Sequence, residues 1–401
     1  MSQERREQIE QFLIDVVEER DRSLELSRSV GILRWFLHQL SHLYRGVVQL
    51  RLFLYRKGIM RHHMLGCQVI SVGNLTVGGT GKTPVVEAFA RELTREGRSV
   101  AVLSRGYKKD EPPVAQRLWD RATLREKRIP PRVVSDGKEL LLDAAMSGDE
   151  PYMLASNLPN VVVLVDKDRV KSGRYAVNKM GCDTLILDDG FQYLALKHQI
   201  EILLVDKTNP FANEKVLPRG LLREPIKNIK RANFVFITKS NGFGSDDLRA
   251  RINKLNPKAE IVECTHAARY LKNVYGDERE DLEFLKGARV TVVSGIARPE
   301  GFEKEVRKRG AQTMKAWRFA DHHRYAQQEI IDIINESKEL GAHAIITTEK
   351  DAVRFPKIER LDVPVYFIRV DIEILSGVED FNACIARICF RRPSELQTAV
   401  V

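Results

Sequence analysis

Short apolar runs alternate with longer segments of helical length along most of the chain. The runs are four or five residues long and nearly continuous in apolar character, which is typical of parallel strands buried on both faces. They lie at residues 69–72, 100–103, 161–165, 184–187, 202–205, 234–237, 290–293, 344–347 and 365–368. Helix-length segments such as 85–96 and 327–340 separate many of them. The alternation predicts an α/β protein with a doubly wound, mostly parallel sheet.

A different pattern precedes the first of these runs. Apolar side chains recur there at steps of three and four, which places them on one stripe of a helix; they are Phe36, Leu40, Leu43, Val47, Leu50 and Leu54. Basic and polar residues fall on the opposite face, and no acidic residue occurs between Glu25 and Glu87. A basic amphipathic helix of this kind suits an anionic membrane surface. A helix packed on a domain core shows the same period, so both interpretations stay open.

Composition narrows the range of partners. The 401 residues allow two domains of ordinary size, and a net charge of +10 favours an acidic partner such as nucleic acid, an anionic membrane or a phosphorylated substrate. Basic residues interleave with aromatic ones only in the amphipathic helix, so we expect no nucleic acid. No apolar run is long enough to predict a transmembrane span. The five cysteines form no CxxC pair, which favours a reducing compartment.

The strongest chemical signal is a glycine-rich segment after the first predicted strand. It consists of Thr76, Val77, Gly78, Gly79, Thr80, Gly81, Lys82 and Thr83, and a predicted helix follows. Glycines let backbone N–H groups approach phosphate oxygens, and a helix N-terminus attracts the same anion. Lys82 is placed to reach the outer phosphates, and Thr83 to offer its hydroxyl to Mg²⁺. Thr76 stands where the usual pattern has a glycine, so the sequence predicts a variant phosphate loop for a nucleoside triphosphate.

Three acidic positions are candidates for metal binding or proton transfer. Asp188 and Asp189 follow the predicted strand 184–187, and the tip of a strand beside a phosphate loop is where a Mg²⁺-holding carboxylate belongs. Their side chains should point to opposite faces, so we expect different tasks for them. Asp149, in Gly148-Asp-Glu-Pro151, is a candidate acceptor for the proton of an attacking hydroxyl, although the segment also fits a simple turn before a helix.

Together, these segments resemble the tetraacyldisaccharide 4'-kinase family, the lipid A kinases of Gram-negative bacteria. The resemblance begins near Gly31 and continues into the C-terminal region. The matching segments are residues 72–84, Ser104-Arg-Gly-Tyr107, Val134-Ser-Asp-Gly137, Gly148-Asp-Glu-Pro151, Asp188-Asp-Gly-Phe-Gln192, Leu222-Arg-Glu-Pro225, Gly295-Ile-Ala-Arg-Pro299, Phe319-Ala-Asp-His-His323 and Thr348-Glu-Lys-Asp-Ala352. Their number and order make a chance match improbable.

The resemblance implies a reaction and a place for it. The family transfers the γ-phosphate of ATP to the 4'-hydroxyl of a tetraacylated glucosamine disaccharide 1-phosphate. It works at the cytoplasmic face of the inner membrane, as a peripheral protein, with an active site in the cleft between two α/β domains. We therefore expect ATP, Mg²⁺, an acylated disaccharide lipid and an anionic membrane surface as partners, while the sequence leaves the oligomeric state open.

The resemblance also implies roles for particular residues. Lys82 and Thr83 would hold phosphate and Mg²⁺, and Asp188 and Asp189 would organise the metal and the phosphates. Asp149, paired with His322, would be the base that acts on the sugar hydroxyl. The remaining matches are Arg223 near the γ-phosphate, Glu224 near the metal and Arg169 at a basic position of the same site. The implied metal ligands are thus Thr83, Asp189 and Glu224.

The expected organisation has four parts. Residues 1–28 form an acidic leader outside the family pattern, and 29–66 the amphipathic helix region. Residues 67–225 form the P-loop nucleotide-binding domain, and 226–401 a second α/β domain that closes the cleft. The chain departs from the family at Tyr193, where His is usual, at Lys108, where Gly is common, and within residues 217–225.

A nucleotide-dependent regulatory switch is the alternative function. Thr238-Lys-Ser-Asn241 comes close to the guanine-reading pattern of P-loop GTPases but ends in Asn instead of Asp. Turnover of GTP without any lipid would favour such a switch.

Overall fold

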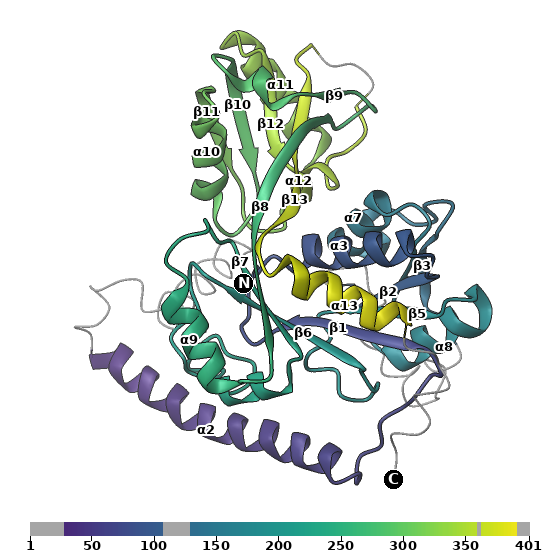
Figure 1. Ribbon diagram of the computed structural model, residues 1–401. Coiled ribbons are helices and arrows are strands. Elements are labelled where there is room, and N and C mark those ends of the chain that lie inside the picture. Colours follow the sequence, from purple (N-terminus) through teal and green to yellow (C-terminus); the bar gives the residue numbers. More distant parts are fainter. Residues whose placement is uncertain (1–27, 107–128, 359–361, 391–401) are drawn as a thin grey trace. The chain divides into compact units, whose positions relative to one another are not determined.

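Two compact units make up the part of the chain that the structure describes. The computed structural model describes residues 28–106, 129–358 and 362–390 (Figure 1). The first unit combines residues up to 100 with 177–265 and those from 374, and the second combines 101–176 with 266–373. The expected acidic leader (up to residue 27) and Lys108 lie outside the described residues. The division of the chain at residue 225 stays a prediction.

The first unit is built on a parallel sheet. Its strands are β8, β7, β6, β1 and β5 in spatial order, and each neighbouring pair is parallel. Their bounds are β1 (Gln68–Asn74), β5 (Thr184–Asp188), β6 (Ile200–Asp206), β7 (Phe234–Thr238) and β8 (Glu260–Asn273), of which the part up to residue 265 belongs to this unit. Every residue of β1, β5 and β7 is buried, as expected for strands with both faces covered.

Helices cover this sheet through aromatic and aliphatic contacts. Phe89 is fully buried, and its ring packs edge-on against Phe236 at 5.6 Å and Phe381 at 5.1 Å between centroids. These contacts join β7 to two helices, α3 and α13. The helices of the unit besides α2 are α3 (Lys82–Arg95), η2 (Ile226–Arg231), α9 (Asp246–Leu255) and α13 (Val378–Phe390).

The predicted amphipathic segment is a single long helix, α2 (Arg28–Arg56), at the edge of the first unit (Figure 1). It packs on the unit through Leu52 and Tyr55, which form a small buried cluster with Leu194. The predicted apolar stripe lies elsewhere on the helix, and Phe36, Leu43, Val47 and Leu50 are between 53% and 68% exposed. The stripe therefore does not serve as a core face. Within the described residues, no helix is both long and apolar enough to cross a bilayer.

The second unit contains two groups of strands. In one group β10 pairs with β11 and β12, and β12 with β13, all in parallel. In the other, β4 is parallel to β2 and antiparallel to β3. The bounds are β2 (Val100–Ser104), β3 (Arg132–Asp136), β4 (Val162–Val165), β9 (Arg279–Glu280), β10 (Arg289–Ser294), β11 (Gln312–Arg318), β12 (Ala344–Thr348) and β13 (Val365–Ser376).

Short helices connect these strands and carry several of the predicted motifs. Among them α7 contacts α12 within the unit. The helices are α6 (Ala144–Ser147), α7 (Asp149–Asn157), α8 (Arg169–Met180), η3 (Leu282–Leu285), α10 (Pro299–Lys308), α11 (Gln327–Glu339) and α12 (Glu349–Ala352). The boundary between the two units falls within β2, α8, β8 and β13.

The nine apolar runs are all strands, which confirms the α/β fold with a mostly parallel sheet. The apolar pattern missed β3, β8, β9 and β11. In β11 every second side chain is exposed, because one face of the strand is open to solvent. β8 is 14 residues long and carries polar and basic residues along much of its length, so it contains no continuous apolar run.

Candidate active site

The glycine-rich loop joins β1 to α3 in the first unit. Gly78 has a φ of 115° and Gly81, directly before α3, a φ of 81°, and both values lie in the region that favours glycine. A side chain added at Gly79 would meet no atom within 4 Å. The loop therefore combines the strand, the turn and the helix N-terminus that a phosphate cradle requires. Thr80 and Thr83 are buried, while Thr76 is half-buried and bridges to Leu222.

The end of β7 supports this loop from one side. Thr238 donates its hydroxyl to the carbonyl oxygen of Thr80 at 2.8 Å. Lys239 donates to the carbonyl of Gly79 and to Asp206 Oδ2, each at 2.6 Å. Lys239 and Asp206 thus form an ion pair that fixes the loop to the ends of two strands. The segment that comes close to a guanine-binding motif, Thr238-Lys-Ser-Asn241, therefore contacts the glycine-rich loop through its first two residues.

Lys82 lies beside the carboxylates predicted at the end of β5. Its Nζ is 3.6 Å from Asp189 Oδ1 and 3.5 Å from Asn74 Oδ1. Asp189 follows the strand in a left-handed conformation, with a φ of 56°, and its other oxygen accepts from Arg223 Nη1 at 2.6 Å. Asp188 is the last residue of β5, is buried, and pairs in register with Val72. The structure therefore brings Lys82, Asp189 and Arg223 together, and their roles stay predictions.

Arg223 and Glu224 differ in what they contact. The backbone N–H of Arg223 donates to Leu75 at 2.7 Å, which ties its segment to the phosphate loop. Glu224 is buried, and its carboxylate accepts from Asn228 at 2.7 Å and from Arg231 at 3.1 Å. Burial raises the pKa of Glu224, and the charge of Arg231 offsets part of that rise. Glu224 is therefore already engaged inside the unit, and its part in metal binding stays a prediction.

The oxygen donors around the loop are of the kind that Mg²⁺ prefers. Thr83 contributes a hydroxyl, and Asp188 and Asp189 contribute carboxylates, all of them hard ligands. Within the described residues, no group of three or more His, Cys, Asp or Glu side chains is gathered as a metal site.

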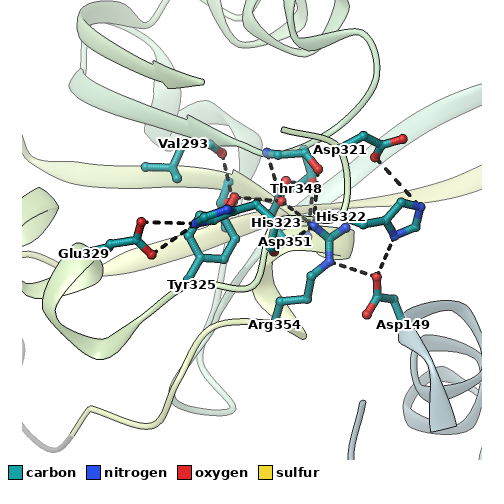
Figure 2. Close-up of polar contacts among 12 residues, drawn as sticks. Asp149, Val293, Asp321, His322, His323, Tyr325, Glu329, Thr348, Asp351 and Arg354 are labelled. Atoms are coloured by element: carbon teal, nitrogen blue, oxygen red, sulfur yellow. Dashed lines mark hydrogen bonds and ion pairs between the residues drawn. The ribbon is translucent and has the colours of Figure 1, made fainter. Parts of the chain in front are cut away.

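The second unit contains the predicted base (Figure 2). Asp149 is the first residue of α7, and its Oδ2 accepts from His322 Nδ1 at 2.9 Å. Arg354 Nε donates to the same oxygen, also at 2.9 Å. Burial would raise the pKa of the Asp149 carboxyl, but the hydrogen bond from His322 and the charge of Arg354 outweigh it and hold that pKa below its ordinary value. Asp149 is therefore a carboxylate at neutral pH.

Arg354 is fixed by a buried network (Figure 2). Its side chain is 3% exposed, and Nη1 donates to Asp351 Oδ1 at 3.2 Å and to the carbonyls of Gly295 and His323 at 3.2 and 3.3 Å. Asp351 also accepts from Tyr325 and from the backbone N–H of Gly295, at 2.9 and 3.0 Å. A side chain at Gly295 would lie within about 3 Å of both Tyr325 and Asp351, so this position requires glycine.

Three matched segments that are far apart in the sequence meet around Asp149. They begin at Gly295, Phe319 and Thr348, and the 2.9 Å contact between Asp149 and His322 joins positions 173 residues apart. The two histidines of the Asp-His-His triplet differ in role. His323 stacks on Phe319 at 4.7 Å and pairs with Glu329 at 3.1 Å, away from Asp149.

No local sequence pattern marks Arg354. It lies two residues beyond the matched segment that ends at Ala352, and its partner Asp149 is 205 positions away. Its position shortly after a family motif was the signal that the sequence offered. Arg169, a further basic residue implied by the resemblance, is buried at the start of α8, where it donates to the carbonyl of Lys167.

Comparisons with known proteins identify relatives of this chain. A model of the family described as tetraacyldisaccharide-1-P 4'-kinase matches residues 33–389. A tetraacyldisaccharide 4'-kinase from Anaeromyxobacter dehalogenans is 39% identical over 352 residues, which cover 86% of this chain and 87% of the relative. The corresponding protein of Halothermothrix orenii is 32% identical, over 93% of this chain and 97% of its own length.

A solved structure is similar as well. The crystal structure of LpxK from Aquifex aeolicus in complex with ATP is 28% identical and superposes with a TM-score of 0.69, over 89% of this chain and the whole of that one. These similarities favour a kinase over a nucleotide-dependent switch.

Proposed function

The chain belongs to the tetraacyldisaccharide-1-P 4'-kinase family, and from that premise we propose that it transfers the γ-phosphate of ATP to the 4'-hydroxyl of a tetraacylated glucosamine disaccharide 1-phosphate in lipid A biosynthesis. The match over residues 33–389 is the observation that carries this activity. In the transfer, a bond forms between the 4' oxygen and the γ-phosphorus. The bond from that phosphorus to the bridging oxygen of ADP breaks, and the hydroxyl loses its proton.

The loop between β1 and α3 holds the triphosphate. Backbone N–H groups of Gly78, Gly79 and Gly81 and the N-terminus of α3 bind phosphate oxygens, and Lys82 supplies the positive charge. The partners of Lys82 in the structure are 3.5 and 3.6 Å away, longer than strong hydrogen bonds, so the ammonium group exchanges them for phosphate oxygens at low cost. Arg223 is oriented by Asp189 toward the same region and neutralises charge that develops on the transferred group.

A Mg²⁺ ion would be held by Thr83 and Asp189 together with phosphate oxygens, and it would neutralise charge on the nucleotide. Glu224 is the further ligand that the family resemblance implies. Because Asn228 and Arg231 already bind its carboxylate, Glu224 would act by orienting this end of the site unless those contacts are released.

Asp149 takes the proton of the 4'-hydroxyl. The pair of donors on Oδ2 keeps the carboxylate ionised and fixes its orientation. His322 then stabilises the orientation of Asp149 and not the substrate itself. Its Nδ1 donates to Asp149, and its Nε2 lies 3.9 Å from the carboxylate of Asp321.

The protein acts as a peripheral protein at the cytoplasmic face of the inner membrane of a Gram-negative bacterium. The exposed stripe of α2, with Phe36, Leu43, Val47 and Leu50, supports this attachment, because apolar side chains at helical spacing gain by entering the lipid interface. Basic residues on the same helix add attraction to anionic lipids, about 1 kcal/mol for each residue near the surface.

Incubation with labelled ATP and a panel of acylated glucosamine disaccharides tests the activity. We expect label in a disaccharide 1-phosphate that carries a free 4'-hydroxyl and none in the analogue that lacks this hydroxyl. Labelling of neither compound, with release of phosphate from ATP alone, would contradict the transferase assignment and favour a nucleotide switch.

A further inference from the structure

We propose that a basic pocket beside α2 binds the phosphate of an anionic phospholipid headgroup, a lipid distinct from the acylated disaccharide substrate. The pocket has a volume of about 340 Å³ and lies between α2 and the segment 214–227. Its polar lining includes His38, His42, Arg45, Glu214, Lys215 and Lys227. This inference rests on the proposed membrane attachment and gives it a specific ligand.

The charge of the lining favours an anion. Arg45, Lys215 and Lys227 contribute three cations, and the single carboxylate of the lining, Glu214, forms an ion pair with Arg251 at 2.7 Å. A concave site with an excess of positive charge concentrates anions. Its volume lies within the range of small-ligand pockets, so it has room for a headgroup phosphate.

The histidine pair of the pocket has the spacing of two metal ligands. His38 and His42 are one helical turn apart, and their Nε2 atoms are 3.2 Å from each other. Two ligands of a tetrahedral zinc ion with bonds of 2.0–2.1 Å would be about 3.3 Å apart, so the spacing alone fits a metal. The three cations in the same lining oppose a bound cation, however, and the pair instead offers imidazole N–H donors to an anion.

The position of the pocket on α2 identifies the anion as a lipid headgroup. At 100° per residue, His38, His42 and Arg45 fall on a flank of the helix that adjoins the face buried at Leu52, with His38 and Arg45 on the polar side opposite the exposed apolar stripe. Trp35, which is 64% exposed, lies between this flank and the stripe. When the stripe enters the acyl region, the flank lies at the level of the headgroups, where aromatic residues also concentrate.

The pocket also adjoins the segment that carries Arg223. Tyr44 on α2 donates its hydroxyl to the carbonyl of Arg223 at 3.0 Å, and Gln49 donates to Asn228 at 3.2 Å. A phosphate held by both Arg45 and Lys227 would bridge α2 and this segment at a third point. Headgroup binding would thus stabilise the contact between the membrane helix and the arginine proposed to act on the γ-phosphate.

The test compares two charge-matched double variants of the full chain. Arg45→Gln with Lys227→Gln removes two cations from the pocket, and Arg56→Gln with Lys57→Gln removes two from the end of the same helix. Sedimentation with phosphatidylcholine vesicles, with and without phosphatidylglycerol, measures binding. We expect the pocket variant to lose at least about tenfold more affinity for the anionic vesicles than the control. Equal losses would mean diffuse attraction and would overturn the site.

Three further measurements separate the alternatives. In neutral detergent micelles the pocket variant should keep the KM for the disaccharide substrate; a raised KM would assign the pocket to the substrate's own phosphate. Zn²⁺ bound by the wild type and lost in His38→Ala would make it a metal site. Tight binding of inorganic phosphate without vesicles would make it a site for a soluble anion.

The membrane attachment has a separate test. If Leu43→Glu with Leu50→Glu leaves vesicle binding unchanged, the proposed attachment itself fails.

A second inference comes from the other unit: we infer that Arg354 is a positioning residue for Asp149. Arg354 Nε and His322 Nδ1 both bind Oδ2 of Asp149 at 2.9 Å, and none of the described residues bonds Oδ1. The two donors therefore leave Oδ1 as the oxygen that accepts the proton. The guanidinium is itself immobile, because Asp351 and the carbonyls of Gly295 and His323 hold Nη1.

Removing the charge of Arg354 should change the pH dependence of activity, which the loss of a purely structural contact would not do. A base acts when deprotonated, so activity falls on the acidic side as pH drops through the pKa of Asp149. Arg354 helps to keep that pKa low. Its removal should raise the pKa and move the acidic limb of the kcat/KM profile to higher pH.

Arg354→Gln and Arg354→Lys test this inference, with Arg318→Gln, which breaks an ion pair with Glu303 elsewhere in the unit, as the control. We expect Arg354→Gln to lower kcat at neutral pH at least tenfold and to shift the acidic limb upward. Arg354→Lys keeps the charge and should restore most of the limb position but not the full rate. An unshifted limb in a folded Arg354→Gln protein would overturn the inference. If Arg354→Gln does not fold, an Arg354→Lys protein with the wild-type rate and pH profile would also overturn the inference.

Discussion

The two groups of candidate catalytic residues are held in different ways. Around the phosphate loop, Lys82 has partners at 3.5 and 3.6 Å, and the backbone at Gly79 borders open space. Around Asp149, the contacts are 2.9 Å long and lead into a network in which Asp351 is fully buried. In the first group Lys82 is loosely paired, although Asp189 beside it accepts from Arg223 at 2.6 Å; in the second group Asp149 itself is fixed by its neighbours.

The difference follows from the chemistry that each group is proposed to perform. A cation that must bind phosphate needs protein partners that are easily exchanged, since strong pairing would compete with the nucleotide. A general base must instead keep its position and its ionisation state before substrate arrives, because misplacement costs rate directly. Loose pairing and tight pairing are thus each suited to their task, and the comparison can be tested by substitution in either group.

The largest effect is expected from Lys82→Ala. Loss of the cation in the phosphate cradle should abolish detectable transfer, because charge neutralisation is the main contribution of the protein to phosphoryl transfer. The weak pairing of Lys82 also predicts that the folded state changes little, with a stability loss of no more than about 1 kcal/mol. Transfer assays and thermal unfolding measure both. Transfer at the wild-type rate would remove the phosphate-loop assignment.

Asp149→Asn should have the next largest effect. The carboxamide has nearly the same shape but cannot accept the proton as a carboxylate does, so kcat should fall by about 10²–10³-fold. The affinity for ATP should remain, since Asp149 is proposed to act on the sugar hydroxyl. Equilibrium binding of a nucleotide analogue beside the rate measurement checks this. If ATP binding is lost along with the rate, Asp149 would belong to the nucleotide or metal site instead.

The candidates around the glycine-rich loop are marked by a local sequence pattern, whereas those around Asp149 are not. Lys82, Thr83 and the glycines are adjacent in the chain, and their order carries the chemistry, so a short stretch of sequence is sufficient to predict a phosphate loop. The apolar runs likewise predicted nine strands, because burial on both faces leaves a local signature. Arg354 was not predicted because its contact with Asp149 spans 205 positions, and no local pattern marks such a contact.

The resemblance supplied what local patterns did not. Asp149 alone fitted a simple turn before a helix, and the Asp-His-His triplet alone did not indicate which histidine faces it. The family match proposed His322, and the structure places its Nδ1 at 2.9 Å from the carboxylate. The amphipathic stripe shows the opposite limit: its period fitted a core helix and a membrane helix equally, and the exposure of Leu43 and its neighbours excludes the core face without showing what covers the stripe.

The smallest change that separates the two groups is one methyl group, added to a glycine in each. Gly295→Ala places a Cβ 2.9 Å from the Tyr325 hydroxyl and 3.0 Å from Asp351 Oδ1, so the network around Arg354 must shift. We expect a stability loss of about 1–3 kcal/mol and a fall in kcat of a few-fold, measured by thermal unfolding and by transfer at saturating ATP.

Gly79→Ala is the matched substitution. The new Cβ meets no protein atom within 4 Å, so stability should be unchanged, and the effect should appear as a several-fold rise in the KM for ATP, because the methyl group occupies space that the phosphates approach. The same substitution should therefore affect stability and kcat in one group and nucleotide binding in the other. If Gly79→Ala instead destabilised the protein while the KM for ATP stayed constant, the loop would be a packed turn, and the contrast between an exchangeable cradle and a fixed base would not hold.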